Sequence, residues 1–126
     1  MNKRIRKKQL KKHGEYVDPR ECWDLDCTIA KFIIPRLKVF KRDSDCYPGY
    51  GDIDSSEDWL KILDKMILAF EYVLENDTWW INDSRYKYFA FDDDANERYN
   101  KEYTRRREVI KEGLGLFAEY FMALWW

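Results

Sequence analysis

Three stretches of the chain carry apolar side chains at the spacing of one face of an α-helix. In the first stretch the intervals are four, three, four and three positions, at Trp23, Cys27, Ala30, Ile34 and Leu37. A second stripe runs from Trp59 to about Glu75, and a third runs from Tyr99 to Leu124. A helix with one apolar face must cover that face with a partner. The sequence therefore predicts an all-α fold, a bundle of three long helices.

Proline and glycine should shape two of these helices. Pro35 lies inside the first stripe, which predicts a kink there or a split near Ile34. Gly113 and Gly115 interrupt the third stripe, at a cost of about 1 kcal/mol each relative to alanine. We expect a neighbouring helix to approach closely at both glycines and to compensate that cost.

The segment between the second and third stripes fits two structures. Residues 79–91 begin with two tryptophans and continue, after a polar turn, with aromatic residues that alternate with other side chains. This pattern is compatible with a small β-hairpin, or with an ordered loop that covers the end of the bundle.

The charge of the chain is divided between its two parts. Lys and Arg number 23 and Asp and Glu number 24, but residues 1–13 hold seven of the bases and no acid. We therefore predict a basic N-terminal arm, residues 1–17, before one acidic helical domain, residues 18–126. The arm is either a frayed tail that lies on this chain or a neighbour, or a segment that contacts phosphates.

Several classes of protein are not expected. No apolar run approaches the ~18 residues that cross a bilayer, so we expect no membrane partner. The basic N-terminus leads into no apolar segment, so we expect no secretory signal. Three cysteines are too few for a disulfide framework, and a reducing cytoplasm fits that count.

Four segments carry a resemblance to a known family. They are ECWDLDCTIAKFIIPRLKVFK, YPGYG, EDWLKILDKMILAFEYVLE and LGLFAEYFMALWW, in this order. Together, over residues 20–75 and 108–126, they resemble a family of small helical proteins of phage and prophage genomes. The matching positions are Trp23, Leu25, Asp26, Pro35, Arg36, Leu37, Pro48, Gly49, Trp59, Phe117, Ala118, Tyr120, Phe121, Leu124 and Trp125. The resemblance implies an accessory phage protein in the host cytoplasm, such as an antagonist of host defence, and no catalytic residues are carried over from it.

Histidine and cysteine offer little chemistry. The only histidine is His13, in the basic arm, which argues against a Ser-His or Cys-His triad. Together with Cys22, Cys27 and Cys46 it could form a zinc site, but ordinary thiols explain these cysteines as well. We predict no bound metal.

Two glutamate pairs suggest a second kind of metal site. Glu71 and Glu75 lie four residues apart, as do Glu108 and Glu112. Such pairs on facing helices could bind Mg²⁺, as in all-α nucleotide pyrophosphatases, and a solvated helix face is the alternative. We predict no enzyme and no cofactor.

Arginine and aromatic residues give the most specific site prediction. Arg106 interrupts an apolar stripe, so it must meet either an acid, such as Asp26, Glu71 or Glu75, or an anionic ligand. Tryptophan and tyrosine would suit stacking on a base or contact with a protein. The predicted ligand-binding residues are Arg36, Arg105, Arg106, Trp79, Trp80, Arg85 and Tyr86.

These observations lead to three functional hypotheses. The first is a non-enzymatic phage accessory protein that sequesters an anionic nucleotide signal. The second is an inhibitor that binds a host immune protein, as anti-CRISPR proteins do. The third is a metal-dependent nucleotide pyrophosphatase. The aromatic C-terminus and the Trp79-Trp80 segment also predict a homo-oligomer.

Overall fold

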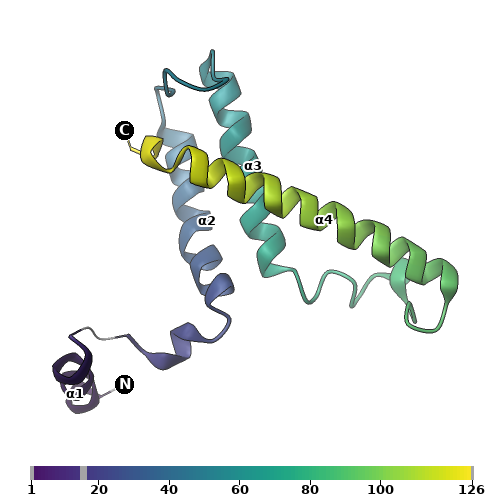
Figure 1. The fold of residues 1–126 in the computed structure, drawn as a ribbon, viewed down its shortest axis with the longest axis horizontal. Coiled ribbons are helices and arrows are strands. Elements are labelled where there is room, and N and C mark those ends of the chain that lie inside the picture. The colour runs from purple at the N-terminus through teal and green to yellow at the C-terminus, as the bar shows by residue number, and fades with distance from the viewer. Residues whose placement is uncertain (1, 15–16, 126) are drawn as a thin grey trace.

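The computed structural model describes residues 2–14 and 17–125, and in these ranges the chain is all-α, as predicted (Figure 1). The α-helices are α1 (Lys3–His13), α2 (Leu25–Asp43), α3 (Ser56–Leu74) and α4 (Asp93–Glu119). Short 3₁₀ helices lie at Pro19–Cys22, Ser84–Tyr86 and Phe121–Ala123.

Helix α3 is the centre of the bundle. Helices α2 and α3 run in opposite directions along each other, and α4 crosses α3 (Figure 1). The backbones of α2 and α4 do not approach within 8 Å in the described residues, so α3 joins the two. It also supplies half of the buried core residues, which are Ala30, Ile34, Leu37, Ile53, Trp59, Leu63, Met66, Ile67, Phe70 and Tyr120.

Side chains in the loops fix where α3 and α4 begin. The Ser55 side chain accepts a hydrogen bond from the N–H of Asp58 at 3.2 Å. The Asp92 carboxylate accepts from the N–H groups of Asp94 and Ala95. Each contact gives an acceptor to N–H groups that the first turn of a helix leaves without a partner. Ser55 and Asp92 are therefore the N-caps of α3 and α4.

Helix α2 continues through Pro35 without a break. The predicted split near Ile34 was therefore wrong. Helix α3 packs against α2, and Ile34 is buried in the core they share. That packing stabilises the helix on both sides of the proline. The first apolar position of the predicted stripe was also wrong, because Trp23 precedes the helix and is 80% exposed.

The two glycines of α4 differ in their surroundings. A Cβ atom on Gly113 would overlap the Cβ atom of Ala69 and the carbonyl oxygen of Lys65, both on α3. The predicted close approach is therefore confirmed at Gly113. At Gly115 it was wrong, because no atom would lie within 4 Å of an added Cβ among the described residues.

Residues 75–92 form an ordered run of turns, and the β-hairpin alternative was wrong. Successive N–H groups bond to carbonyls three residues earlier, as from Ile81 to Thr78 and from Phe89 to Tyr86. Tyr88 adopts a left-handed conformation, with φ of 58°. The aromatic side chains explain the outcome, because several gather around Tyr99 of α4 instead of alternating between two sheet faces.

The basic arm contains a helix. The side chain of Asn2 accepts from the N–H of Ile5 at 2.9 Å, and the helix ends at Gly14, where φ is 73°. In the described residues, no other helix comes within 8 Å of the α1 backbone. The described part of the arm is therefore a capped, charged helix.

Candidate functional site

The predicted aromatic residues come together beside the first half of α4. The Trp79 ring stacks on Tyr99, with 5.0 Å between centroids, and meets Tyr86 and Trp80 edge to face. On the other side, Phe89 stacks on Tyr99 at 4.1 Å. Tyr86 is buried and both tryptophans are half-buried, so their rings pack mainly against one another. The sequence grouped these residues correctly but did not identify Tyr99 as the ring at their centre.

Arg105 and Arg106 share one carboxylate. Arg105 donates two hydrogen bonds to Glu102, at 2.7 and 2.9 Å, and a third to the hydroxyl of Tyr72. Arg106 donates to Glu102 and also to Glu75 on the preceding segment, both at 3.1 Å. Of the partners considered for Arg106, the structure therefore selects an acid, Glu75.

The Arg106 guanidinium is also covered by rings. Its central carbon lies 4.4 Å from the centroid of Tyr72 and 5.0 Å from that of Trp79. The side chain is only 18% exposed. A cation so enclosed and so paired stabilises the junction of α3 and α4, and two of its nitrogens already donate to carboxylates.

The arginines also govern the titration of Glu102. Hydrogen bonds from Arg105, and then from Arg106, hold the pKa of Glu102 below its ordinary value. A lowered folded-state pKa stabilises the fold at neutral pH, and that contribution is lost as the pH falls through the folded pKa. We expect Glu102→Gln to lose less free energy of unfolding than the parent chain between about pH 5 and pH 3.

Urea denaturation at each pH measures this difference. Glu97→Gln is the control, because Glu97 is exposed and lies 3.5 Å from Lys101 only. The control should follow the parent chain over the same pH range. Equal acid sensitivity of Glu102→Gln and the parent chain would contradict the assigned role of Glu102.

The other two predicted arginines have different surroundings. Arg85 is exposed and forms a paired hydrogen bond with Asp83, whose pKa is lowered by that contact. Arg36 lies on α2, apart from the aromatic cluster, with its guanidinium 3.7 Å from the ring centroid of Phe32. The predicted residues therefore belong to two regions, and the structure does not bring Arg36 to the others.

The predicted metal ligands do not form a metal site in the described residues. No group of three or more His, Cys, Asp or Glu side chains lies close enough to hold an ion there. Cys22 and Cys46 are exposed and Cys27 is partly buried, while the side chain of His13 lies outside the described residues.

Three of the four glutamates, Glu71, Glu75 and Glu112, pair with cationic side chains instead. Glu71 pairs with Lys38 at 3.1 Å, and Glu112 pairs with Lys65 at 2.8 Å. Glu75 forms an ion pair with Arg106. These contacts join neighbouring helices, so the glutamates have a structural role in the bundle.

A cavity at the opposite end of α3 was not predicted from the sequence. It has a volume of about 580 Å³ and is mainly apolar, with aspartates at its rim. We call it the aromatic–acidic pocket, and its lining residues are Asp43, Ser44, Asp45, Cys46, Tyr47, Pro48, Gly49, Tyr50, Trp59, Met122, Ala123 and Trp125. They come from the end of α2 and the loop after it, the first turn of α3 and the segment after α4.

Tyr120 holds these three segments together. Its ring stacks on Tyr50 and meets Trp59 edge to face, with 5.7 Å between centroids in each case. Tyr120 is only 2% exposed, and burial raises the pKa of its hydroxyl. Gly51, where φ is 71°, leaves space for that hydroxyl, since a Cβ atom there would overlap it. The loop is thereby fixed against the end of α4.

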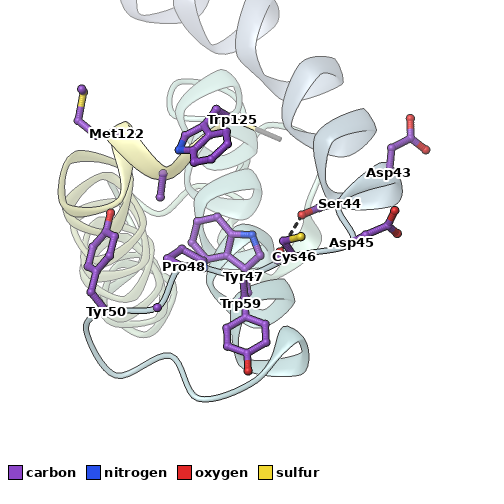
Figure 2. Close-up of a pocket in the computed structure, with 12 residues that line it drawn as sticks. Asp43, Ser44, Asp45, Cys46, Tyr47, Pro48, Tyr50, Trp59, Met122 and Trp125 are labelled. Carbon is purple, nitrogen blue, oxygen red and sulfur yellow. Dashed lines mark hydrogen bonds between the residues drawn. The ribbon is translucent and has the colours of Figure 1, made fainter.

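The pocket has an aromatic interior and an acidic edge. In Figure 2 the rings of Trp59 and Trp125 lie between Tyr50 on one side and Asp43 and Asp45 on the other. Asp43 pairs with Arg42 at 2.9 Å, which lowers the pKa of Asp43. No Lys or Arg in the described residues pairs with Asp45. Both carboxylates point outward from the rings (Figure 2), so an exposed aromatic surface with acidic charge at its edge is suited to a ligand that carries a cationic group next to an apolar one.

The composition of the loop and of the C-terminal segment could have indicated this pocket. Residues 43–58 contain six acids and no base, together with two tyrosines, and the C-terminal segment is aromatic as well. None of the predicted ligand-binding residues lies in this range, so the combination of acid and aromatic side chains was missed.

Two general findings bear on the predicted function. No family model matches the chain, and neither a curated protein nor a solved structure matches it. Within residues 2–14 and 17–125, every helix is too short or too polar to cross a membrane. The resemblance to a family of phage proteins therefore stays a prediction.

Proposed function

We propose that this chain is a non-enzymatic binding protein that holds a basic and apolar segment of a partner protein in the aromatic–acidic pocket. One observation carries the proposal: exposed tryptophan and tyrosine rings surround a cavity of about 580 Å³ next to unpaired acidic charge. This is the second of the three hypotheses that the sequence suggested, in which the chain binds a protein rather than a nucleotide.

The dimensions of the pocket support a side-chain ligand. Cavities that hold small ligands or anchoring side chains measure about 300–1,000 Å³. Trp125 is 76% exposed and Met122 is 82% exposed, so both are available to a partner. Tryptophan and tyrosine supply much of the binding energy at protein interfaces because they bury large apolar areas with few rotatable bonds.

The charge around the pocket supports a cationic partner. Six acidic residues and no Lys or Arg lie between positions 43 and 58. Acidic charge at the edge of an interface steers a basic partner and repels an acidic one. An arginine or lysine flanked by large apolar residues meets both requirements of the pocket.

An anionic nucleotide has less support as the ligand. The residues that line the pocket include no Lys or Arg. At the other end of the molecule, Arg85, Arg105 and Arg106 each already pair with a carboxylate. A phosphate would have to displace these partners, which costs part of its binding energy.

The identity of the partner follows only from the family resemblance. If the chain is a phage accessory protein, its partner is a host protein, such as an immune effector that binds nucleic acid through basic residues. That assignment is part of the proposal and depends on the resemblance.

A peptide-binding assay tests the proposal. The probe is a fluorescein-labelled pentapeptide that alternates leucine and arginine, and its charge-reversed control alternates leucine and glutamate. We expect the basic probe to bind with Kd of about 10–100 μM, and the acidic probe not to bind. Asp45→Lys and Trp125→Ala should each weaken binding by about tenfold or more.

Two matched variants control for general effects. Asp77→Lys makes the same charge change at an exposed position outside the pocket. Phe91→Ala removes an aromatic ring that is 91% exposed, also outside the pocket. Both should bind the probe like the parent chain. Equal binding by all four variants, or binding of the acidic probe, would overturn the proposed site.

A further inference from the structure

Helix α2 has a second apolar face that no other helix covers in the described residues. The face contains Leu25, Ile29, Phe32 and Val39, which are between 41% and 57% exposed. With Arg36 between Phe32 and Val39, these positions are spaced by four, three, four and three residues. This is the repeat by which two helices pack along a common seam.

The exposed face is distinct from the core face of the same helix. The core face carries Ala30, Ile34 and Leu37, and it packs against α3. At 100° per residue the two sets lie on nearly opposite sides of α2. A surface helix of a monomer needs one apolar face only, so the second face is unexplained by the fold of a single chain.

We propose that this face is a dimer seam, and that a second copy of this chain packs α2 against α2 in the antiparallel direction with Phe32 at the two-fold axis. Leu25 and Val39 lie seven residues to either side of Phe32. An antiparallel pair therefore places Leu25 of each copy against Val39 of the partner subunit. The seam is self-complementary, as a two-fold interface requires.

Charge selects the antiparallel direction. The chain before α2 contains the basic helix α1, and the chain after α2 contains the six acids of residues 43–58. An antiparallel pair brings the basic part of each copy toward the acidic part of the other. A parallel pair would place like charges together at both ends, which is unfavourable.

Arg36 is compatible with a buried position along the seam. Its guanidinium carbon lies over the Phe32 ring, 3.7 Å from the centroid, and the side chain donates to the carbonyl oxygen of Phe32 at 2.8 Å. A planar guanidinium stacked in this way is covered more readily than an ammonium group. In the proposed register the two copies of Arg36 lie on opposite sides of the two-fold axis, about 12 Å apart along the helix direction.

The area of the face predicts a modest affinity. Covering the exposed parts of these side chains in both copies removes on the order of 1,000 Å² from water, which is near the lower bound for a specific interface. We therefore expect the dimer of the full chain to dissociate at micromolar concentrations and to weaken as salt is added, because part of its specificity is electrostatic.

Sedimentation velocity of the full-length chain tests the seam. The parent chain should be dimeric at about 100 μM in ~50 mM salt, and Phe32→Glu should raise the dimer Kd by about 50-fold or more. Phe91→Glu is the matched control, since Phe91 is 91% exposed and lies outside α2. Far-UV circular dichroism should show unchanged helix content in both variants. A monomeric parent chain, or a Phe32→Glu variant that dimerises normally, would overturn the proposal.

Disulfide cross-linking tests the direction without relying on that variant. The native thiols are first removed by Cys22→Ser, Cys27→Ala and Cys46→Ser. In this background Phe32→Cys should cross-link to itself under mild oxidation, whereas Leu25→Cys alone should not. A mixture of the Leu25→Cys and Val39→Cys chains should cross-link. Self-linkage of Leu25→Cys would instead show a parallel pair and contradict the proposed geometry.

The dimer and the proposed function are separable. None of the seam residues lines the aromatic–acidic pocket. Phe32→Glu should therefore bind the leucine–arginine probe as the parent chain does, so that loss of the dimer and loss of peptide binding are distinguishable.

Discussion

Gly113→Ala should destabilise the protein by about 3 kcal/mol, although alanine favours a helix by about 1 kcal/mol over glycine. The reason is the crossing of α4 over α3. The added methyl group would overlap the Cβ atom of Ala69 and the backbone carbonyl of Lys65, and neither is the end of a flexible side chain. The two helices would have to separate, which loosens the core between them. Thermal and urea denaturation measure the loss, with an expected fall in Tm of about 10 °C.

Gly115→Ala is the control for this prediction. Gly115 is in the same helix, two residues away, and has open space where a Cβ would be. We expect it to stabilise the chain by about 0.5–1 kcal/mol, because alanine loses less backbone freedom on folding. The same sign for both variants would contradict the packing of α4 on α3.

Trp59→Ala should have a still larger effect, with a loss of about 3–5 kcal/mol in the free energy of unfolding. The Trp59 side chain is only 2% exposed and contacts the ring of Tyr120. Its removal leaves a cavity at the point where α3, the end of α4 and the loop after α2 meet. It also removes one wall of the aromatic–acidic pocket.

Trp125→Ala separates the role in stability from the role in binding. Trp125 lines the same pocket but is 76% exposed, so its removal should change the free energy of unfolding by less than about 0.5 kcal/mol. Chemical denaturation of both variants gives the comparison. A Trp125→Ala chain as unstable as Trp59→Ala would mean that Trp125 is part of the core and unavailable to a partner.

Helix periodicity predicted the all-α fold, but it did not predict which apolar helix faces the chain itself would cover. The stripe at Ala30, Ile34 and Leu37 correctly identified the core side of α2. The apolar side chain of Phe32 lies on another side of the same helix, and the structure leaves it 57% exposed. Periodicity identifies an apolar face, but whether this chain or another covers it is set by the placement of neighbouring helices.

The aromatic cluster and the pocket were not equally predictable. Trp79, Trp80 and Tyr86 are close in sequence, so their grouping followed from local composition. The pocket required the loop near Tyr50 to meet the segment near Trp125, which lies far along the chain. Such contacts depend on the crossing of α4 over α3, and the sequence of one chain does not specify that geometry directly.

The arginines show why a charged residue on an apolar stripe is ambiguous. Arg106 must meet a negative group in either case, and the sequence offered both ligand phosphate and protein carboxylate. The structure places Glu75 and Glu102 within hydrogen-bond distance. Glu102 is four residues before Arg106 in the same helix, so the sequence spacing alone predicts this one of the two carboxylate partners.

The most direct test of the account is a titration of ¹⁵N-labelled protein followed through its tryptophan indole N–H signals. With the leucine–arginine pentapeptide, the account predicts shifts at Trp59 and Trp125, and none at Trp79 and Trp80. With ATP, it predicts no shift at any of the four. Shifts at Trp79 and Trp80 on addition of ATP, with Trp59 and Trp125 unchanged by the peptide, would contradict the proposed pocket and favour an anionic ligand at the arginine-rich end.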